Sequence, residues 1–232
     1  MNVDNNTETS YRYERKFNIT GLSANEIESI VKNHPAMFSE IFHQRYINNI
    51  YFDDYNFSNF YQNINGNSKR IKYRIRWYGD FAGYIEKPFF EIKIRQGNIG
   101  EKPTYPLVPF NVYEGMPYNS IREIVLNSQL PDDIIFSFEF QKAVVANRYL
   151  RKYFKSADNK FRITLDSDIS YYRLQGINLS FNHNFADFES VVIEIKYDIK
   201  DENSIMNITN FFPFRITKNS KYVNGIENMY LF

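Results

Sequence analysis

The sequence contains no cysteine, and only three of its 232 residues are histidine. The absence of cysteine excludes disulfide bonds, thiolate metal sites and cysteine nucleophiles. Glycine and proline are also scarce, at 9 and 8 residues, and no linker or low-complexity segment divides the chain. Because a chain of this length can bury one large core, we expect a single domain over residues 10–232, preceded by a disordered polar tail at residues 1–9.

A large net charge and a long apolar run are missing as well. The formal net charge is +1, so the chain has no global field that would attract nucleic acid or a membrane surface. No apolar run approaches the ~20 residues of a membrane span, and the N-terminal residues lack the apolar core of a secretion signal. We therefore expect a soluble, cytoplasmic protein with no nucleic-acid partner and no membrane segment.

Aromatic residues are abundant instead, with 22 Phe and 19 Tyr, and this composition favours β-structure. Residues 70–78 show the clearest pattern. Basic residues occupy positions 70, 72, 74 and 76, and apolar or aromatic residues occupy the positions between them. This alternation predicts a strand with two different faces, on which the cations lie about 6.5–7 Å apart. Because such cations repel one another, an anion over that face is one interpretation, and a solvated outer face is the other.

Several other segments share this design, with one apolar face and one face that carries charges of both signs. They are residues 11–19, 89–95, 161–168 and 191–198. Extended structure is also predicted at residues 45–52, 105–110, 135–140 and 144–154. Helices are predicted at residues 23–34, 120–128, 201–211 and 221–230, and the first two begin with the capping boxes Ser23/Glu26 and Ser120/Glu123. The fold class is therefore α+β with mainly antiparallel strands.

The helices need an apolar surface to cover, and the apolar strand faces supply one. A closed sheet would then turn its charged face toward a lumen, whereas a sandwich would leave that face in water. Buried charges are costly unless they pair or meet a ligand. Guanidinium groups suit phosphate, and carboxylates on the same wall suit Mg²⁺ or Mn²⁺ that bridges phosphate oxygens. A polyanion with a divalent metal would therefore complete such a lumen.

Eight short motifs occur in an order that carries a family resemblance. They are Glu14-Arg-Lys16, Arg74-Ile-Arg76, Glu91-Ile-Lys93, Gly100-Glu-Lys102, Tyr149-Leu-Arg151, Arg162-Ile-Thr-Leu-Asp166, Glu194-Ile-Lys196 and Asn219-Ser-Lys221. Together they resemble the polyphosphate polymerase (VTC) domain of the triphosphate tunnel metalloenzyme superfamily, which also contains the CYTH phosphatases and cyclases. The resemblance extends over nearly the whole chain.

This resemblance implies a closed antiparallel β-barrel of about eight strands, with helices packed outside and a charged tunnel that binds ATP, triphosphate or polyphosphate. It implies catalytic roles for the basic side chains Lys16, Arg74, Arg76, Lys93, Arg151, Arg162 and Lys221. It implies ligand binding by Tyr149, Lys196, Lys102 and Lys218. It also implies that Glu194 holds the metal, Mn²⁺ or Mg²⁺. Arg70 and Lys72 fall outside the motifs and are expected at the tunnel entrance.

One departure from the superfamily pattern narrows the expected activity. Arg12 stands where the first glutamate of the Glu-X-Glu-X-Lys pattern belongs, which favours the polymerase-like branch over a two-metal hydrolase. The leading hypothesis is metal-dependent phosphoryl transfer that makes polyphosphate from ATP. The alternatives are a hydrolase of triphosphate or nucleoside triphosphates on the same scaffold, and a non-catalytic sensor of polyphosphate or nucleotides.

Some residues with chemical potential have simpler interpretations. For Glu91 and Asp166 we expect structural pairing that holds the arginine side chains in place, and we expect Trp77 in the core. The three histidines fall near apparent helix ends and loops, so surface positions are expected. The Asp53-Asp54 pair predicts a turn after a strand.

Overall fold

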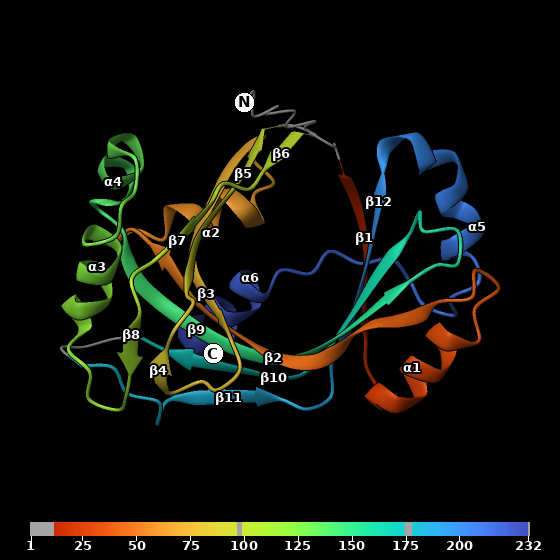
Figure 1. Cartoon of the computed structure of the whole chain (residues 1–232), viewed down its shortest axis with the longest axis horizontal. Coiled ribbons are helices and arrows are strands. Elements are labelled where there is room, and N and C mark those ends of the chain that lie inside the picture. Colours follow the sequence, from red (N-terminus) through yellow and green to blue (C-terminus); the bar gives the residue numbers. More distant parts are fainter. Residues whose placement is uncertain (1–11, 97–98, 175–177, 232) are drawn as a thin grey trace, which may run out of the picture.

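The computed structural model describes residues 12–96, 99–174 and 178–231 (Figure 1). Its main element is a ten-stranded sheet in which the strands pair in the order β1-β12-β10-β9-β2-β3-β5-β6, with β11 on β10 and β7 on β5. The named pairings are antiparallel, which confirms the α+β class and the mainly antiparallel sheet. The predicted tail, residues 1–9, lies outside the described residues.

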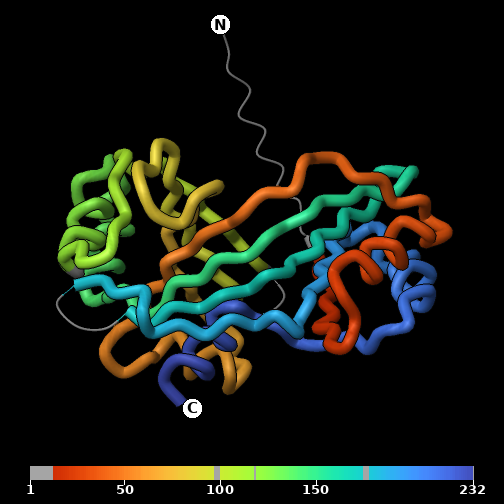
Figure 2. The backbone as a smooth tube through the Cα atoms, turned by 90° about the horizontal axis from the view of Figure 1, so that it is seen from below, coloured from red at the N-terminus to blue at the C-terminus, as the bar shows by residue number. Residues whose placement is uncertain are grey.

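The strands of this sheet are β1 (Arg12–Ile19), β2 (Ser39–Asp53), β3 (Lys69–Tyr78), β5 (Phe89–Gln96), β6 (Ile99–Glu101), β7 (Thr104–Pro106), β9 (Lys142–Lys155), β10 (Arg162–Arg173), β11 (Asn184–Asp187) and β12 (Val191–Asp198). A second, small sheet pairs β4 (Gly83–Ile85) with β8 (Phe110–Val112). Figure 2 shows β2, β9, β10 and β11 running side by side.

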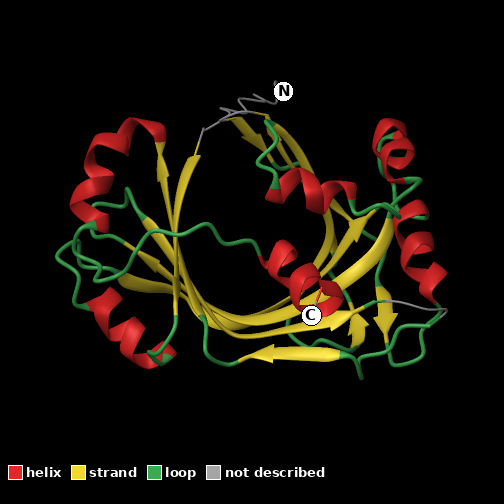
Figure 3. Ribbon diagram, turned by 180° about the vertical axis from the view of Figure 1, so that it is seen from behind, coloured by secondary structure: helices red, strands yellow, loops and turns green. Residues whose placement is uncertain are grey.

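The main sheet bends into a deep trough (Figure 3). Strands β2, β9 and β10 form its floor, β1 and β12 rise on one side, and β3 and β5 rise on the other. Among the described residues, no backbone pairing joins β1 to β5 or β6, so backbone pairing does not establish the expected closed barrel. The gap is bridged by side chains instead, because Lys93 Nζ on β5 lies 3.2 Å from Glu14 Oε1 on β1.

Helices cover the convex face of the sheet in two groups. Helices α3 (Tyr118–Leu126) and α4 (Asp132–Phe138) pack with β4 and β8 over β3 and β5, in a core that contains Trp77 and Phe90. Helices α1 (Ala24–Lys32) and α5 (Ile205–Thr209) cover β1, β10 and β12, in a core that contains Phe17 and Ile193. The prediction that the apolar strand faces turn outward to helices is therefore confirmed.

Two details of the helix predictions are wrong. Residues 132–138 form helix α4, although the sequence predicted extended structure at 135–140. Pro131 and two acidic residues open this helix, and its apolar side chains recur at helical spacing, so that Phe138 is fully buried. Helix α3 begins after Pro117, without a side-chain cap, so Ser120 lies inside the first turn and forms no capping box. The capping box of Ser23 with Glu26 is confirmed.

The helix near the C-terminus, α6 (Lys221–Ile226), lies within the trough at one end and continues as a π-helical turn, η2 (Glu227–Leu231). Its Tyr222 packs against Tyr51 and Val145 on the floor strands. Gly225 permits this close approach, since a Cβ there would lie 3.0 Å from the Tyr171 ring and from Val145 Cγ2. Ser220 caps the helix, because its hydroxyl accepts a hydrogen bond from the Val223 amide. A 3₁₀ turn, η1 (Ile199–Ser204), precedes α5.

Asp53 fixes the orientation of α6 from the end of β2. Its carboxylate accepts hydrogen bonds from the amides of Asn59 and Phe60, both at 2.9 Å, and from the Tyr222 hydroxyl. Those amides belong to the start of helix α2 (Ser58–Ile64). The predicted turn is present, and its carboxylate also connects β2, α2 and α6.

Candidate functional site

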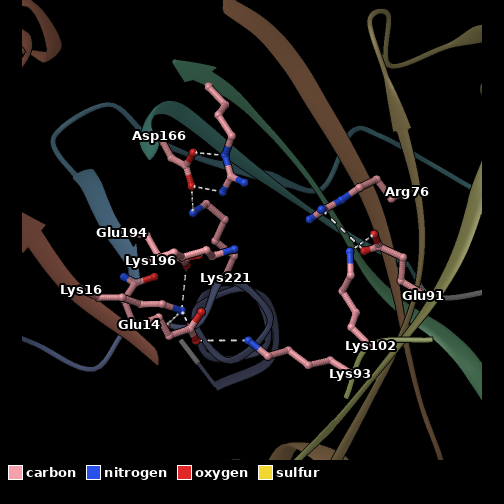
Figure 4. A network of polar contacts seen from close by, with 12 residues as sticks. Glu14, Lys16, Arg76, Glu91, Lys93, Lys102, Asp166, Glu194, Lys196 and Lys221 are labelled. Carbon is pink, nitrogen blue, oxygen red and sulfur yellow. Dashed lines mark hydrogen bonds and ion pairs between the residues drawn. The ribbon is translucent and has the colours of Figure 1, made fainter. Parts of the chain in front are cut away.

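The concave face of the sheet carries charged side chains from both walls, the floor and α6 (Figure 4). We call this set the charged ring. Its basic members are Lys16, Lys72, Arg74, Arg76, Lys93, Lys102, Arg151, Lys196 and Lys221, and its carboxylates are Glu14, Glu91, Asp166 and Glu194. The basic residues outnumber the carboxylates, so each carboxylate is shared. Strand alternation explains this gathering, because every second residue faces the same side.

Glu91 on β5 holds three basic side chains. Its carboxylate accepts from Arg74 Nε at 2.6 Å and from Lys102 Nζ at 2.8 Å, and Arg76 Nη1 lies 3.6 Å away. Burial would raise the pKa of this carboxyl, but Arg74 and Arg76 outweigh burial and hold the pKa at about 2. Glu91 therefore stays ionised, and it orients the two arginines of β3.

Asp166 on β10 plays the same part on the other side of the ring. Arg151 donates to it from Nε and Nη2, the latter at 2.7 Å, and Lys221 of α6 donates to its second oxygen. The Asp166 side chain is 1% exposed. Burial opposes its ionisation, but Arg151 and Lys221 lower its pKa. The pairing expected for Glu91 and Asp166 is thus confirmed.

The third group lies where β1 meets β12. Lys16 Nζ lies 3.2 Å from Glu194 Oε2 and 3.5 Å from Glu14 Oε1, and it also donates to the Asn219 carbonyl at 3.2 Å. Lys196 holds the other Glu194 oxygen at 2.8 Å. Burial acts against the charge of Glu194, but Lys16 and Lys196 lower its pKa well below the ordinary range.

Tyr149 lies at the centre of the floor and is 1% exposed. Its hydroxyl accepts from Arg76 Nη2 at 3.3 Å, and the Lys221 ammonium lies 4.5 Å from the centre of its ring. Burial alone would raise the pKa of this phenol, but the neighbouring Arg151 and Arg76 lower it. Tyr149 therefore connects the Arg76 side of the ring to the Lys221 side.

Lys72 belongs to the charged ring, although it falls outside the family motifs. Its Nζ donates to Ser220 Oγ, at the start of α6, at 2.8 Å, and no described carboxylate pairs with it. Burial, followed by repulsion from Lys93 and Lys16, lowers its pKa to about 7. The alternation at residues 70–76 contained this signal, because it placed Lys72 on the face of Arg74 and Arg76. The position of Lys72 in the strand therefore predicts that it faces the charged ring, whereas the family motifs do not include it.

Two of the predicted site residues have no side-chain contact with the ring carboxylates. Arg162 is exposed on β10 opposite Lys196, and Lys218 is exposed in the segment before α6. Neither side chain has a hydrogen-bond or ion-pair partner among the described residues. Lys102 and Lys196 lie at the rim, with side chains 49% and 42% exposed.

The donors for a metal are few. Within residues 12–96, 99–174 and 178–231, no three His, Cys, Asp or Glu side chains gather as a metal cluster. Glu14 and Glu194 are two carboxylates that share Lys16. Two carboxylates suit Mg²⁺ or Mn²⁺ only when phosphate oxygens and water complete the coordination. The residues present therefore fit a metal that binds together with a phosphate ligand.

The histidines do not belong to the charged ring. His43 and His183 are exposed, as predicted, but His34 is buried, and the surface position predicted for it is wrong. Its two ring nitrogens contact the Ile208 carbonyl and the Ala36 amide, both at 3.0 Å, and its ring stacks on Phe212. These contacts satisfy His34 within the core between α1 and α5.

A cavity of about 440 Å³ lies beside α5, lined by Met206, Thr209, Asn210, Phe212, Phe214, Arg215 and Ile216. It lies on the convex side of the sheet, because Phe212 belongs to the core there. Its one charged lining residue is Arg215, so it lacks the arrangement of charges that the concave face offers. The charged ring is therefore the better candidate site.

No described helix has the length and apolar character needed to cross a membrane. A comparison with curated proteins finds no match. The solved structures that share the fold include two candidate adenylate cyclases. A candidate adenylate cyclase from Bacillus halodurans is 12% identical, with a TM-score of 0.52, and the alignment covers 95% of this chain and 99% of that one. A candidate adenylate cyclase from Vibrio parahaemolyticus is 13% identical, with a TM-score of 0.50 and coverage of 93% and 98%.

The profile of the VTC domain matches residues 11–230, which is almost the whole chain. The match includes every member of the charged ring and confirms the resemblance drawn from the eight motifs. The chain therefore belongs to the VTC domain family.

Proposed function

We propose that this protein transfers phosphoryl groups in the charged ring with the help of a divalent metal, and that its reaction is the synthesis of polyphosphate from ATP. One observation carries the proposal. The concave face holds a fixed excess of cations, in which each carboxylate is shared by two or three bases and Lys72 has no described carboxylate partner. A polyanion would neutralise this excess.

The orientation of the arginines supports phosphate binding. Arg74 uses Nε and Nη2 on Glu91, and Arg151 uses Nε and Nη2 on Asp166. Each guanidinium is thereby held in one plane before a ligand arrives. Such preorganised donors stabilise the charge that develops on a transferred phosphoryl group without further reorganisation. Phosphoryl transfer requires mainly positioning and charge stabilisation, which suits a site without a cysteine nucleophile.

Glu194, with Glu14 beside it, would hold Mn²⁺ or Mg²⁺, which supplies neutralisation of charge on phosphate oxygens. In the structure, Lys16 occupies the space between these carboxylates, at 3.2 and 3.5 Å. Lys16 would therefore turn from the carboxylates toward phosphate when both ligands bind. Tyr149 would donate its hydroxyl hydrogen to a phosphate oxygen, because Arg76 leaves that hydrogen free for a ligand.

One assay separates the proposal from its alternatives. Purified protein is incubated with ATP and Mn²⁺, and long-chain polyphosphate and free phosphate are both measured. Polyphosphate supports the polymerase. Phosphate without polymer supports a hydrolase. Tight triphosphate binding without turnover supports a sensor. The absence of triphosphate binding would contradict all three and would leave the charged ring without the ligand that we assign to it.

A further inference from the structure

A group of aromatic rings surrounds a single arginine next to the charged ring. We call Phe42, Arg45, Tyr78 and Tyr153 the Arg45 cluster. The Arg45 guanidinium carbon lies 4.2 Å from the centre of the Tyr78 ring and 5.1 Å from that of Tyr153, and Arg45 Nε donates to the Tyr153 hydroxyl at 3.1 Å. Phe42 meets Tyr153 edge to face, with centroids 5.8 Å apart. The cluster therefore presents a flat cation between aromatic faces.

The cluster lies at the end of the ring that α6 leaves uncovered. Tyr78 follows Arg76 by two residues on β3, Tyr153 follows Arg151 by two residues on β9, and Arg45 is the partner of Arg151 on β2. Residues two apart on a strand share a face and lie about 6.5–7 Å apart. Helix α6 contacts the opposite end of the same strands, at Tyr51 and Val145.

A purely structural role leaves the exposure of this cluster unexplained. Phe42 is 59% exposed and Tyr78 is 41% exposed, and Arg45 is exposed as well. No described carboxylate pairs with Arg45. Exposed aromatic rings beside a guanidinium are the surfaces on which nucleobases stack, because every base has a π-face and arginine adds a cation–π contribution.

We propose that the Arg45 cluster binds the nucleobase of a nucleoside triphosphate whose phosphates lie in the charged ring. This inference rests on the proposed function, since it assumes that the phosphates occupy the ring. Tyr78 and Tyr153 each lie two residues beyond a ring arginine on the same strand, and this step of about 6.5–7 Å leaves room for a ribose between the phosphates and the aromatic rings. Stacking reads the face of a base and not its edge, so ATP and GTP bind with similar affinity. Inorganic tripolyphosphate has no base and therefore does not contact the Arg45 cluster.

Binding measurements with Tyr78→Ala test this proposal directly. The affinities of wild type and variant for ATP, GTP and sodium tripolyphosphate are measured by calorimetry, without divalent metal, so that turnover does not interfere. Loss of one stacking ring weakens nucleotide binding about 5- to 100-fold and leaves tripolyphosphate binding unchanged. Tyr78→Phe, which keeps the ring, retains nucleotide affinity. Tyr84→Ala is the matched control, because Tyr84 is a 66% exposed tyrosine on β4, outside the cluster. Thermal unfolding checks that each variant is folded.

Three results would overturn the inference. The first is an equal loss of ATP and tripolyphosphate affinity in Tyr78→Ala, which would mean that the ring supports the phosphate site. The second is no loss of either affinity. The third is wild-type protein that binds tripolyphosphate as tightly as ATP, which removes the nucleobase subsite but leaves phosphate binding intact. Wild-type protein that binds neither ligand would instead overturn the proposed function itself.

Discussion

We predict that Lys72 makes the binding of a phosphate ligand depend on pH, because its pKa is lowered by its surroundings. Its ammonium lies among the cations Lys16, Lys93, Arg70 and Arg74, and its one described hydrogen-bond partner is the neutral Ser220 hydroxyl. Burial first, and these cations second, lower its pKa from 10.5 to about 7. At neutral pH the free protein is therefore a mixture of protonated and neutral Lys72.

A bound triphosphate adds negative charge beside Lys72 and raises its pKa, so binding takes up a proton. The affinity for tripolyphosphate therefore falls as the pH rises above about 7, by up to about tenfold per pH unit. We expect wild-type protein to lose about ten- to thirtyfold in affinity between about pH 7 and pH 8.5. Lys72→Met removes the titrating group, so its affinity shows only the pH dependence of the ligand and of the remaining groups.

The assay is calorimetric titration with tripolyphosphate in buffers that differ in ionisation enthalpy, because the difference between buffers reports the protons taken up.

Lys72 also affects the stability of the fold. Since the pKa of Lys72 is lower in the folded state, the unfolded chain binds more protons between about pH 7 and 10.5, and the free energy of unfolding rises with pH across that window. If the affinity for tripolyphosphate had the same pH dependence in wild type and Lys72→Met, and if binding took up equal numbers of protons, this reasoning would be refuted.

Three further predictions concern other parts of the site. Arg74→Ala and Arg76→Ala each weaken tripolyphosphate binding about 10- to 100-fold through lost charge-assisted hydrogen bonds, as calorimetry measures; unchanged affinity would contradict their place in the ring. Glu194→Gln keeps tripolyphosphate binding and abolishes metal-dependent turnover of ATP, whereas surviving turnover would mean that another carboxylate holds the metal. Asp53→Asn and Tyr222→Phe each lower the free energy of unfolding by about 1–3 kcal/mol in denaturant titrations, and equal stability to wild type would show that the buried contact between them contributes nothing.

The faces of the strands could be predicted from the sequence because alternation is a local property of extended chains. Trp77 is 1% exposed on the convex side, and Arg74 and Arg76 face the concave side, as the pattern of residues 70–78 required. The pattern fails where the backbone departs from regular extension. Asp168 has a φ of 50°, and the register of β10 against β9 shifts between Ser167 and Ser170. Asp168 therefore does not join Asp166 on the charged face.

Features that depend on distant contacts could not be predicted from the sequence. Nothing local shows that α6 enters the trough, because its position depends on Tyr222 reaching Asp53 and on Gly225 meeting Tyr171. His34 is another case, since its partners Ile208 and Phe212 are far away in the chain. The sequence predicts a strand at residues 135–140, because short apolar segments suit either structure, and packing against the convex face favours the helix.

The distribution of charge accounts for the polyanion binding that we propose for a nearly neutral chain. The net charge of +1 is a sum over the whole sequence, whereas the charged ring concentrates basic residues around a few carboxylates. Glu91 and Asp166 stay ionised, as their lowered pKa values show, so they orient the arginines without neutralising the surplus. A phosphate ligand then meets donors that are already aligned, and the ordering cost of binding is reduced. Removing Glu91 would therefore increase the positive charge of the ring and yet weaken its affinity for phosphate, because Arg74 and Arg76 would lose the carboxylate that orients them. Glu91→Gln distinguishes the two effects by calorimetry with tripolyphosphate. The added positive charge alone predicts tighter binding, whereas the loss of arginine preorganisation predicts weaker binding.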